Sequence, residues 1–159
     1  MGHVVSLNDA LRRRFLARKR GEKVVFTNGV FDILHRGHIE YLTEARAFGN
    51  VLFIGLNSDA STRRIKGDTR PFVHEDDRAF CLASLLTVDY VVLFDTDTPL
   101  ELIKALEPDV LVKGGDWKVE EIVGYDEVRA IGGEVLNLPY REGYSTTRLL
   151  ETIVAGKAK

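Results

Sequence analysis

Two histidines stand three residues apart at the start of a predicted helix, and their position is the strongest chemical signal in the chain. His35 and His38 follow a short apolar strand and a turn, with Gly37 between them. Residues at i and i+3 share one face of a helix. A helix N-terminus presents unpaired N–H groups and the positive end of the helix dipole, so it attracts phosphate. The two imidazoles therefore indicate hydrogen bonds to phosphate oxygens, and Gly37 would let a polyphosphate approach closely.

Other chemistries need residues that the sequence does not combine. No third Cys, His or carboxylate stands at zinc-ligand spacing from the two histidines, so no protein metal site is predicted. The sequence also lacks a P-loop run and a G-x-G-x-x-G fingerprint, which disfavours kinase and dehydrogenase functions. Each histidine alone would more often be a packed or capping residue, but the pair together at this turn favours a functional site.

Three further polar segments could handle phosphate or nucleotide. Lys66 begins the polar loop KGDTRP, residues 113–117 read KGGDW after a predicted strand, and Ser145 opens the last predicted helix. Two glycines at a strand end permit close backbone approach. Each segment also has an ordinary explanation: a solvated lysine, a packed Trp117 and a serine N-cap.

The elements that must position these residues follow from the hydrophobic pattern. Short strands are predicted over 23–27, 51–56, 89–94, 109–113 and 134–138. Helices are predicted over 7–19, 37–48, 59–65, 75–86, 99–106, 125–131 and 145–154. Four of the five strands are nearly continuous apolar runs, which is typical of a parallel sheet covered on both faces. The sequence thus predicts an α/β fold, a Rossmann-like, doubly wound, five-stranded parallel sheet.

This sheet predicts where a ligand binds. In such folds ligands lie beyond the carboxyl ends of the strands. This rule directs attention to the turns after residues 27, 57, 94, 113 and 138. Of these, the turns after Thr27, Asn57 and Lys113 are expected to form one site together with the helix start at Ser145.

One domain is expected over residues 1–159, with a helix within 1–20 and a loose tail at 156–159. The N-terminal helix should bury a face carrying Leu7, Leu11, Phe15 and Leu16, with the basic run at 12–14 in solvent. Ser6 or Asn8 would cap this helix.

Composition narrows the function classes. The 159 residues are 45% hydrophobic and 29% charged, which indicates a globular domain, and a net charge of -2 disfavours a nucleic-acid partner. The single cysteine, Cys81, cannot form an intramolecular disulfide, so a reducing cytoplasm is the expected location. No apolar run has the length of a membrane span and no signal peptide is recognised, so no membrane association is expected.

Four segments together resemble a known family. They are TNGVFDILHRGH (27–38), NSDAS (57–61), DVLVKGGDW (109–117) and YSTT (144–147). Over about residues 22–155 the chain resembles nucleotidyltransferases with the HxGH signature, and within them the D-glycero-β-D-manno-heptose 1-phosphate adenylyltransferases. Many bacteria fuse that enzyme behind a sugar kinase, and the chain resembles the form without the kinase. One departure is Leu150, where relatives often carry Lys or Arg; Arg148 is a candidate replacement.

The resemblance implies a role for each matching residue. His35, His38 and Lys66 are the expected catalytic residues, because family members contact the nucleotide phosphates with the histidines and close a loop lysine over them. The expected nucleotide-binding residues are Thr27, Asn28, Gly29, Phe31, Gly37, Lys113, Gly114, Asp116, Ser145, Thr146 and Thr147. The expected sugar-phosphate-binding residues are Asp32, Asn57, Arg70 and Arg78. Three of these have alternatives: Asp32 as a turn-stabilising residue, and Arg70 and Arg78 as ion-pair partners of Asp76 or Asp77.

The implied reaction joins ATP and the heptose 1-phosphate into ADP-heptose and pyrophosphate, for lipopolysaccharide core synthesis. The sugar-phosphate oxygen would attack the α-phosphorus in line, with no covalent intermediate. Mg²⁺ is expected, held mainly by the substrate phosphates, and a homodimer is possible. Two alternatives remain: a glycerol-3-phosphate cytidylyltransferase or another HxGH transferase, and a non-catalytic module that senses ATP.

Overall fold

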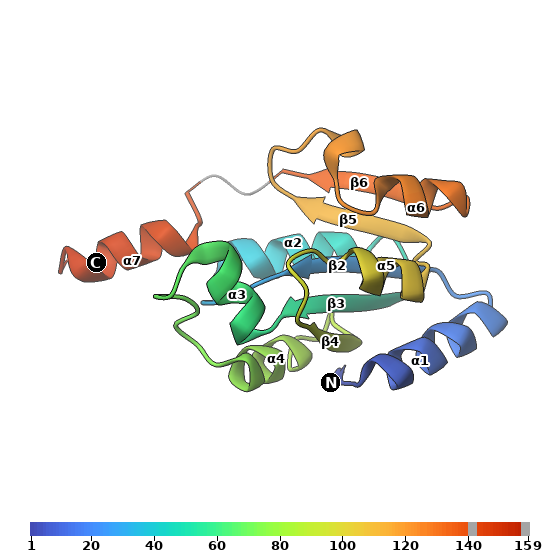
Figure 1. Cartoon of the computed structure of the whole chain (residues 1–159), viewed down its shortest axis with the longest axis horizontal. Helices are drawn as coiled ribbons and strands as arrows, with labels where there is room; N and C mark the ends of the chain where they lie inside the picture. Colours follow the sequence, from blue (N-terminus) through green and yellow to red (C-terminus); the bar gives the residue numbers. More distant parts are fainter. Residues whose placement is uncertain (140–142, 157–159) are drawn as a thin grey trace.

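The chain folds around one parallel sheet (Figure 1). The computed structural model describes residues 1–139 and 143–156, so the end of the predicted tail, 157–159, lies outside the described residues. The strands are β1 (His3–Val4), β2 (Val24–Gly29), β3 (Val51–Asn57), β4 (Tyr90–Phe94), β5 (Val110–Gly114) and β6 (Glu134–Leu138). Their order in the sheet is β1-β4-β3-β2-β5-β6, with all pairs parallel.

The sheet has six strands where the sequence predicts five. The additional strand is β1, two residues that pair with Tyr90 and Val91 at the edge of the sheet. Both β1 residues are exposed, so no apolar run marks this strand in the sequence. The five predicted strands all form, within two residues of the expected bounds at each end.

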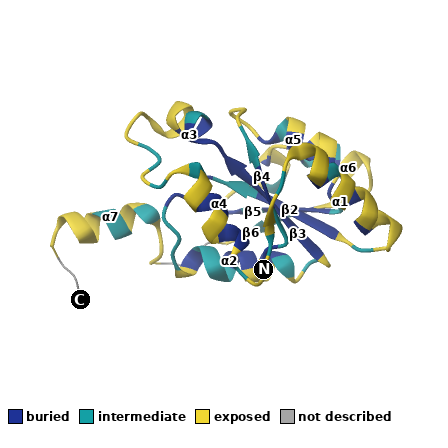
Figure 2. Ribbon diagram, turned by 90° about the horizontal axis from the view of Figure 1, so that it is seen from below, coloured by how far each residue is buried: buried dark blue, intermediate teal, exposed yellow. Residues whose placement is uncertain are grey.

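Helices cover both faces of the sheet (Figure 2). They are α1 (Leu7–Lys19), α2 (Arg36–Arg46), α3 (Asp59–Lys66), α4 (Glu75–Ala83), α5 (Leu100–Leu106), α6 (Tyr125–Ala130) and α7 (Thr146–Val154), with a short 3₁₀ turn, η1, at Val119–Glu121. Two apolar cores result, one on each face. Side chains of α2 and α4 pack in the first core, and side chains of α1, α5 and α6 pack in the second.

Strand β2 shows why the apolar runs predict this architecture. Val24, Val25 and Phe26 are fully buried, but Val25 joins the core under α2 and α4 while Val24 and Phe26 join the other core. Successive side chains of a strand point to opposite faces. A run that is apolar at every position therefore needs helices on both sides, as found here.

Helix α1 is correctly bounded, and Ser6 caps it by accepting a hydrogen bond from the Asp9 N–H, but its predicted buried face is wrong. Leu7, Phe15 and Leu16 are exposed. The face that packs carries Ala10, Ala17 and Arg14 instead.

Arg14 was expected in solvent, yet it is buried. Its guanidinium donates to the carbonyls of Leu106 and Glu107 and pairs with Asp109 at 3.0 Å. It thereby satisfies carbonyl groups at the C-terminus of α5, which a helix end leaves without internal partners.

Helix α7 stands apart from the two layers and projects from the body (Figures 1 and 2). None of its residues is buried. Ser145 is its N-cap, accepting a hydrogen bond from the Arg148 N–H at 3.1 Å. Across the described residues, no helix is both long enough and apolar enough to cross a membrane.

Candidate active site

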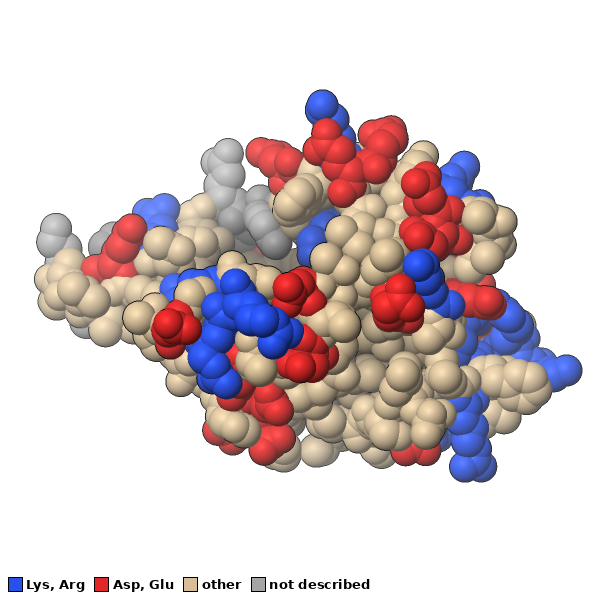
Figure 3. All heavy atoms as spheres, viewed as in Figure 1, with Lys and Arg blue, Asp and Glu red and all other residues tan. Residues whose placement is uncertain are grey.

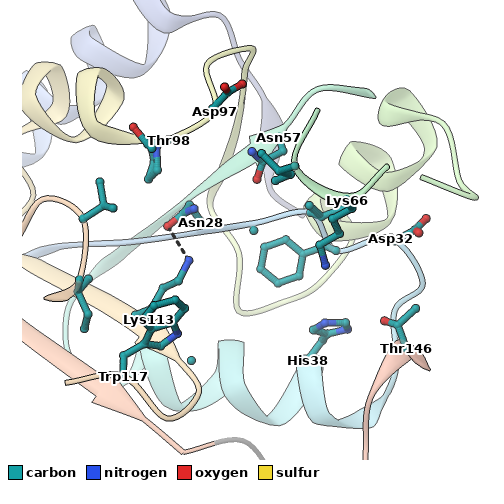
Figure 4. Close-up of a pocket in the computed structure, with 18 of the residues that line it drawn as sticks. Asn28, Asp32, His38, Asn57, Lys66, Asp97, Thr98, Lys113, Trp117 and Thr146 are labelled. Carbon is teal, nitrogen blue, oxygen red and sulfur yellow. Dashed lines mark hydrogen bonds between the residues drawn. The ribbon is translucent and has the colours of Figure 1, made fainter. Parts of the chain in front are cut away.

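A cavity of about 660 Å³ opens at the carboxyl ends of the central strands (Figure 4). Its walls come from the turns after β2, β3, β4 and β5, from the C-terminus of α3 and from the first turn of α7. Lining it are Asn28, Gly29, Val30, Phe31, Asp32, His38, Tyr41, Asn57, Ile65, Lys66, Arg70, Asp97, Thr98, Pro99, Lys113, Gly114, Trp117, Glu121, Ile122, Val123, Thr146 and Thr147. The fold therefore brings the four segments singled out in the sequence to one pocket.

The two histidines form a stacked pair at the N-terminus of α2. Their ring centroids are 3.8 Å apart, and the centroids of the His38 and Phe31 rings are 5.3 Å apart in an edge-to-face arrangement. His38 lines the cavity, while His35 is the N-cap residue of α2 and is not among the lining residues. Of the predicted pair, His38 thus lies in the cavity wall, and His35 stacks against His38 behind that wall.

Burial keeps His38 neutral. It lowers the pKa of His38 to about 4, with smaller contributions from the nearby His35 and Lys66. Burial also lowers the pKa of His35. Within the described part of the chain, the Nδ1 atoms of both rings are buried without a hydrogen-bond partner. A neutral imidazole has a single N–H group to donate.

Gly37 serves the packing of α2 rather than an open approach to phosphate. A Cβ atom at this position would lie 3.0 Å from Cβ of Tyr144 and 3.2 Å from the His35 ring. The glycine thus allows the segment before α7 to lie close against the start of α2. Gly37 is not one of the residues that line the cavity.

Two lysines give the cavity a positive wall. Lys113 Nζ lies 3.3 Å from Asn28 Oδ1, and burial, with a smaller contribution from Lys66, lowers the pKa of Lys113. Within residues 1–139 and 143–156, neither lysine has an ion-pair partner. The lining carboxylates, in contrast, are paired: Asp32 with Arg70, Asp97 with Arg64, and Glu121 with Lys118.

Asp32 fastens the loop after α3 to the turn after β2. Its Oδ1 accepts hydrogen bonds from the backbone N–H groups of Phe72 and Val73 at 2.7 and 3.0 Å. Its Oδ2 accepts from Arg70 at 2.8 Å. Asp32 is buried although it borders the cavity. These contacts fit the turn-stabilising alternative for Asp32. Arg70 lines the cavity, and its ion-pair partner is Asp32 rather than the predicted Asp76 or Asp77.

Arg78 is not a cavity residue, and its predicted ion-pair partners are also wrong. It is fully buried, donates to the carbonyls of Val30 and Val73, and pairs with Asp59 at 2.7 Å. The sequence pattern placed Arg78 beside two acids on its own helix. The observed partner lies on α3, because Arg78 points inward from α4.

The remaining predicted residues fall into two groups. Asn28, Gly29, Phe31, Asn57, Gly114, Thr146 and Thr147 line the cavity. Thr27, Asp116 and Ser145 do not. Thr27 is buried beneath it, with its hydroxyl 2.6 Å from the Tyr41 hydroxyl, and Asp116 is exposed while its neighbour Trp117 takes the place in the wall.

The turn after β4, to which the strand-end rule pointed, supplies site residues that the sequence reasoning did not name. Asp97, Thr98 and Pro99 all line the cavity. The rule that ligands bind beyond strand ends points to this turn. The residues themselves, an Asp-Thr-Pro run, look like any surface turn.

The chain also matches known proteins over most of its length. The model of the cytidylyltransferase-like family matches residues 26–152. The chain belongs to the cytidylyltransferase-like family. This confirms the nucleotidyltransferase class predicted from the HxGH signature.

Several relatives of this cytidylyltransferase-like chain are named bifunctional protein HldE. The protein from Citrobacter koseri is 58% identical over 86% of the chain, and the one from Cronobacter sakazakii is 54% identical over 96%. The chain spans about a third of the length of these relatives, 29% and 32% respectively.

Two solved structures share the fold of this cytidylyltransferase-like chain. A lipopolysaccharide core biosynthesis protein from Thermoplasma volcanium is 30% identical, with a TM-score of 0.63, and the match covers 79% of this chain and all of that one. A pantoate-beta-alanine ligase from Francisella tularensis is 16% identical, with a TM-score of 0.66, over 89% of this chain and 68% of the other. The second likeness concerns the fold alone.

Proposed function

We propose that this chain transfers the adenylyl group of ATP to D-glycero-β-D-manno-heptose 1-phosphate, giving ADP-heptose and pyrophosphate for lipopolysaccharide synthesis. The observation that carries the transfer chemistry is the wall formed by His38, Lys66, Lys113 and the first turn of α7. It combines two cations without carboxylate partners in the described chain, a neutral donor and a helix N-terminus. These are the groups that a triphosphate needs.

The choice of sugar rests on resemblance. The four sequence segments favour the heptose 1-phosphate adenylyltransferases, and relatives more than half identical carry the name HldE. The Thermoplasma volcanium structure is named for lipopolysaccharide core biosynthesis. These relatives support the acceptor and the pathway more strongly than they support the base of the nucleotide.

The proposed step forms one bond and breaks one. A phosphate oxygen of the sugar 1-phosphate attacks the α-phosphorus, and the bond to the β-phosphate oxygen breaks, with its electrons leaving on pyrophosphate. The neutral His38 donates its N–H to a phosphate oxygen, and Lys66 and Lys113 offset charge on the triphosphate. Donors fixed in advance where charge develops lower the barrier without a covalent intermediate.

Mg²⁺, when bound, would neutralise part of the triphosphate charge. Within the described residues no three His, Cys, Asp or Glu side chains gather as a metal site. The carboxylates that border the cavity already hold Arg70, Arg64 and Lys118. A magnesium ion here is therefore proposed to rely on phosphate and water ligands.

A screen of pyrophosphate release tests the proposal. Four nucleoside triphosphates are crossed with heptose 1-phosphate, other sugar 1-phosphates and glycerol 3-phosphate. The proposal expects ATP with heptose 1-phosphate to give the highest kcat/KM. The family description favours one rival: if CTP with glycerol 3-phosphate is faster, the chain is a cytidylyltransferase of polyol phosphates. ATP binding without release for any acceptor would instead indicate a nucleotide sensor.

A further inference from the structure

The turn between β4 and α5 borders the candidate active-site cavity, and the proposed function assigns none of its residues to the phosphate groups. Asp97 and Thr98 line the cavity on the side opposite His38 and Thr146, next to Asn57 (Figure 4). Figure 3 shows acidic side chains among basic ones over this part of the surface. The carboxylate, hydroxyl and amide groups of Asp97, Thr98 and Asn57 thus lie on the side of the cavity opposite His38 and Thr146, with Lys66 between Asn57 and His38 (Figure 4).

Hydrogen bonds from side chains of α3, and one within the turn, hold the turn in place. Arg64 Nε donates to Asp97 Oδ1 at 2.7 Å, and the same guanidinium donates to the carbonyl of Asp95. Ser61 Oγ donates to the carbonyl of Thr96 at 2.9 Å. Thr96 Oγ1 donates to the carbonyl of Thr98 at 2.7 Å. Water could satisfy all of these groups, so the network fixes the position of the turn relative to α3.

One oxygen of Asp97 stays available in this arrangement. Oδ1 holds Arg64, whereas Oδ2 has no hydrogen-bond partner within the described residues, and the side chain is 62% exposed. A carboxylate oxygen is an acceptor only, so its partner must be a donor. Phosphate groups carry negative charge and would be repelled by it. The donors that the proposed substrates offer are the hydroxyl groups of the acceptor sugar and, on ATP, the ribose hydroxyls and the adenine amino group. The kinetic test below distinguishes these two substrates.

We infer that the turn Asp95–Pro99 reads the hydroxyl groups of the acceptor sugar, with Asp97 and Thr98 as specificity-determining residues. The inference rests on the proposed function, because it assigns part of the same cavity to the acceptor. Arg64 is a positioning residue for Asp97. It lies two residues before Lys66 on α3. This short helix therefore positions both the lysine proposed to bind phosphate and the arginine that holds Asp97.

The test compares Asp97→Asn and Thr98→Val with the wild-type chain. In Asp97→Asn the side-chain amide keeps an oxygen that accepts from Arg64 but presents an N–H donor where the carboxylate has its second acceptor. This variant should lower kcat/KM for heptose 1-phosphate by about 10- to 100-fold, the usual effect of a hydrogen bond to a charged group. Thr98→Val should lower it by about 2- to 10-fold.

In both variants the KM for ATP should stay within about twofold of the wild-type value, since each change leaves Lys66 and Lys113 in place. Glu101→Gln is the matched control: this exposed carboxylate pairs with Lys104 at 3.2 Å on α5 and does not line the cavity. Thermal melting of each variant checks that it folds.

Four outcomes separate the hypotheses. A rise in KM for the sugar phosphate alone supports the inference. A parallel rise in KM for ATP overturns it, because the turn would then contact the nucleotide. Unchanged kinetics in both variants also overturn it, while an active wild-type chain would leave the proposed function standing. If the wild-type chain transfers nothing to any sugar phosphate, the proposed function itself fails before the variants are compared.

Discussion

Replacing Lys113 by methionine should stabilise the free protein and weaken its binding of ATP. Methionine keeps most of the length of the lysine side chain but removes its charge. In the free protein that charge is half-buried and is disfavoured by the charge of Lys66, and its one hydrogen-bond partner within the described residues is the amide oxygen of Asn28. A buried charge without an opposite partner costs stability.

The pKa of Lys113 fixes the sign of the stability effect. Its folded-state pKa lies below the ordinary value of 10.5, so the unfolded chain binds the proton more tightly. The protonated lysine therefore destabilises the fold at neutral pH, and this cost fades as the pH rises through the folded pKa toward 10.5. For each kcal/mol by which Lys113→Met raises the free energy of unfolding, Tm should rise by about 2–4 °C. The difference in Tm between the variant and the wild type should become smaller at alkaline pH.

ATP binding should change in the opposite direction. A hydrogen bond from an ammonium group to phosphate contributes about 1.5–3 kcal/mol, so KM for ATP should rise about 10- to 150-fold. Thermal melts from pH 7 to 10 and steady-state kinetics measure the two effects. Lys104→Met, at an exposed lysine that pairs with Glu101, is the control and should change neither. If Lys113→Met has a lower Tm than the wild type, or an unchanged KM for ATP, then Lys113 is not an unpaired cation that binds the phosphates of ATP.

Three further predictions concern other parts of the site and its support. The pKa of His38 is about 4 in the folded chain and 6.5 in the unfolded chain, so the unfolded chain binds the proton first and the wild-type protein loses stability as the pH falls from 6.5 to 4. In His38→Asn the melting temperature should depend less on pH over that range, and kcat should fall about 10²- to 10³-fold. Trp117, the single tryptophan, lines the cavity, so saturating ATP should change the intrinsic fluorescence, and a constant spectrum would place the nucleotide elsewhere. Arg78→Met should lower stability by about 3–5 kcal/mol in denaturant titrations, because it leaves Asp59 and two carbonyls buried without their donor, and a loss under about 1 kcal/mol would contradict this role.

The sequence predicts the sheet well because its strands are buried on both faces. An apolar residue at every position of a run leaves little choice of structure, and the five long strands follow directly. Strand β1 is not predicted because its two residues are both exposed and form no hydrophobic pattern. The buried face of α1 is mispredicted for a related reason: Arg14 is buried through hydrogen bonds to the end of α5, a partner that periodicity along α1 alone cannot reveal.

Site residues can be predicted from the sequence where they stand at the start of a helix or the end of a strand. His38 and the first turn of α7 are found because they start helices, and Lys113 because it nears the end of a strand. Arg78 is misassigned because its acceptors come from three separate segments. The strand-end rule points to the β4 turn, but none of its residues is named as a site residue. Their significance depends on strand order, which places the turn beside Asn57, and not on any feature of the residues themselves.

The projecting helix α7 has a consequence for how ATP binds. A nine-residue helix with no buried residue is marginal in isolation, since helix nucleation is costly and propagation adds little per residue. Thr146 and Thr147 nevertheless form part of the cavity wall. The binding-competent population is then the fraction of molecules with α7 formed, and apparent affinity is reduced by that fraction. ATP, whose triphosphate we place at the N-terminus of α7, would therefore raise this fraction as it binds, and part of its binding free energy would go into forming the helix.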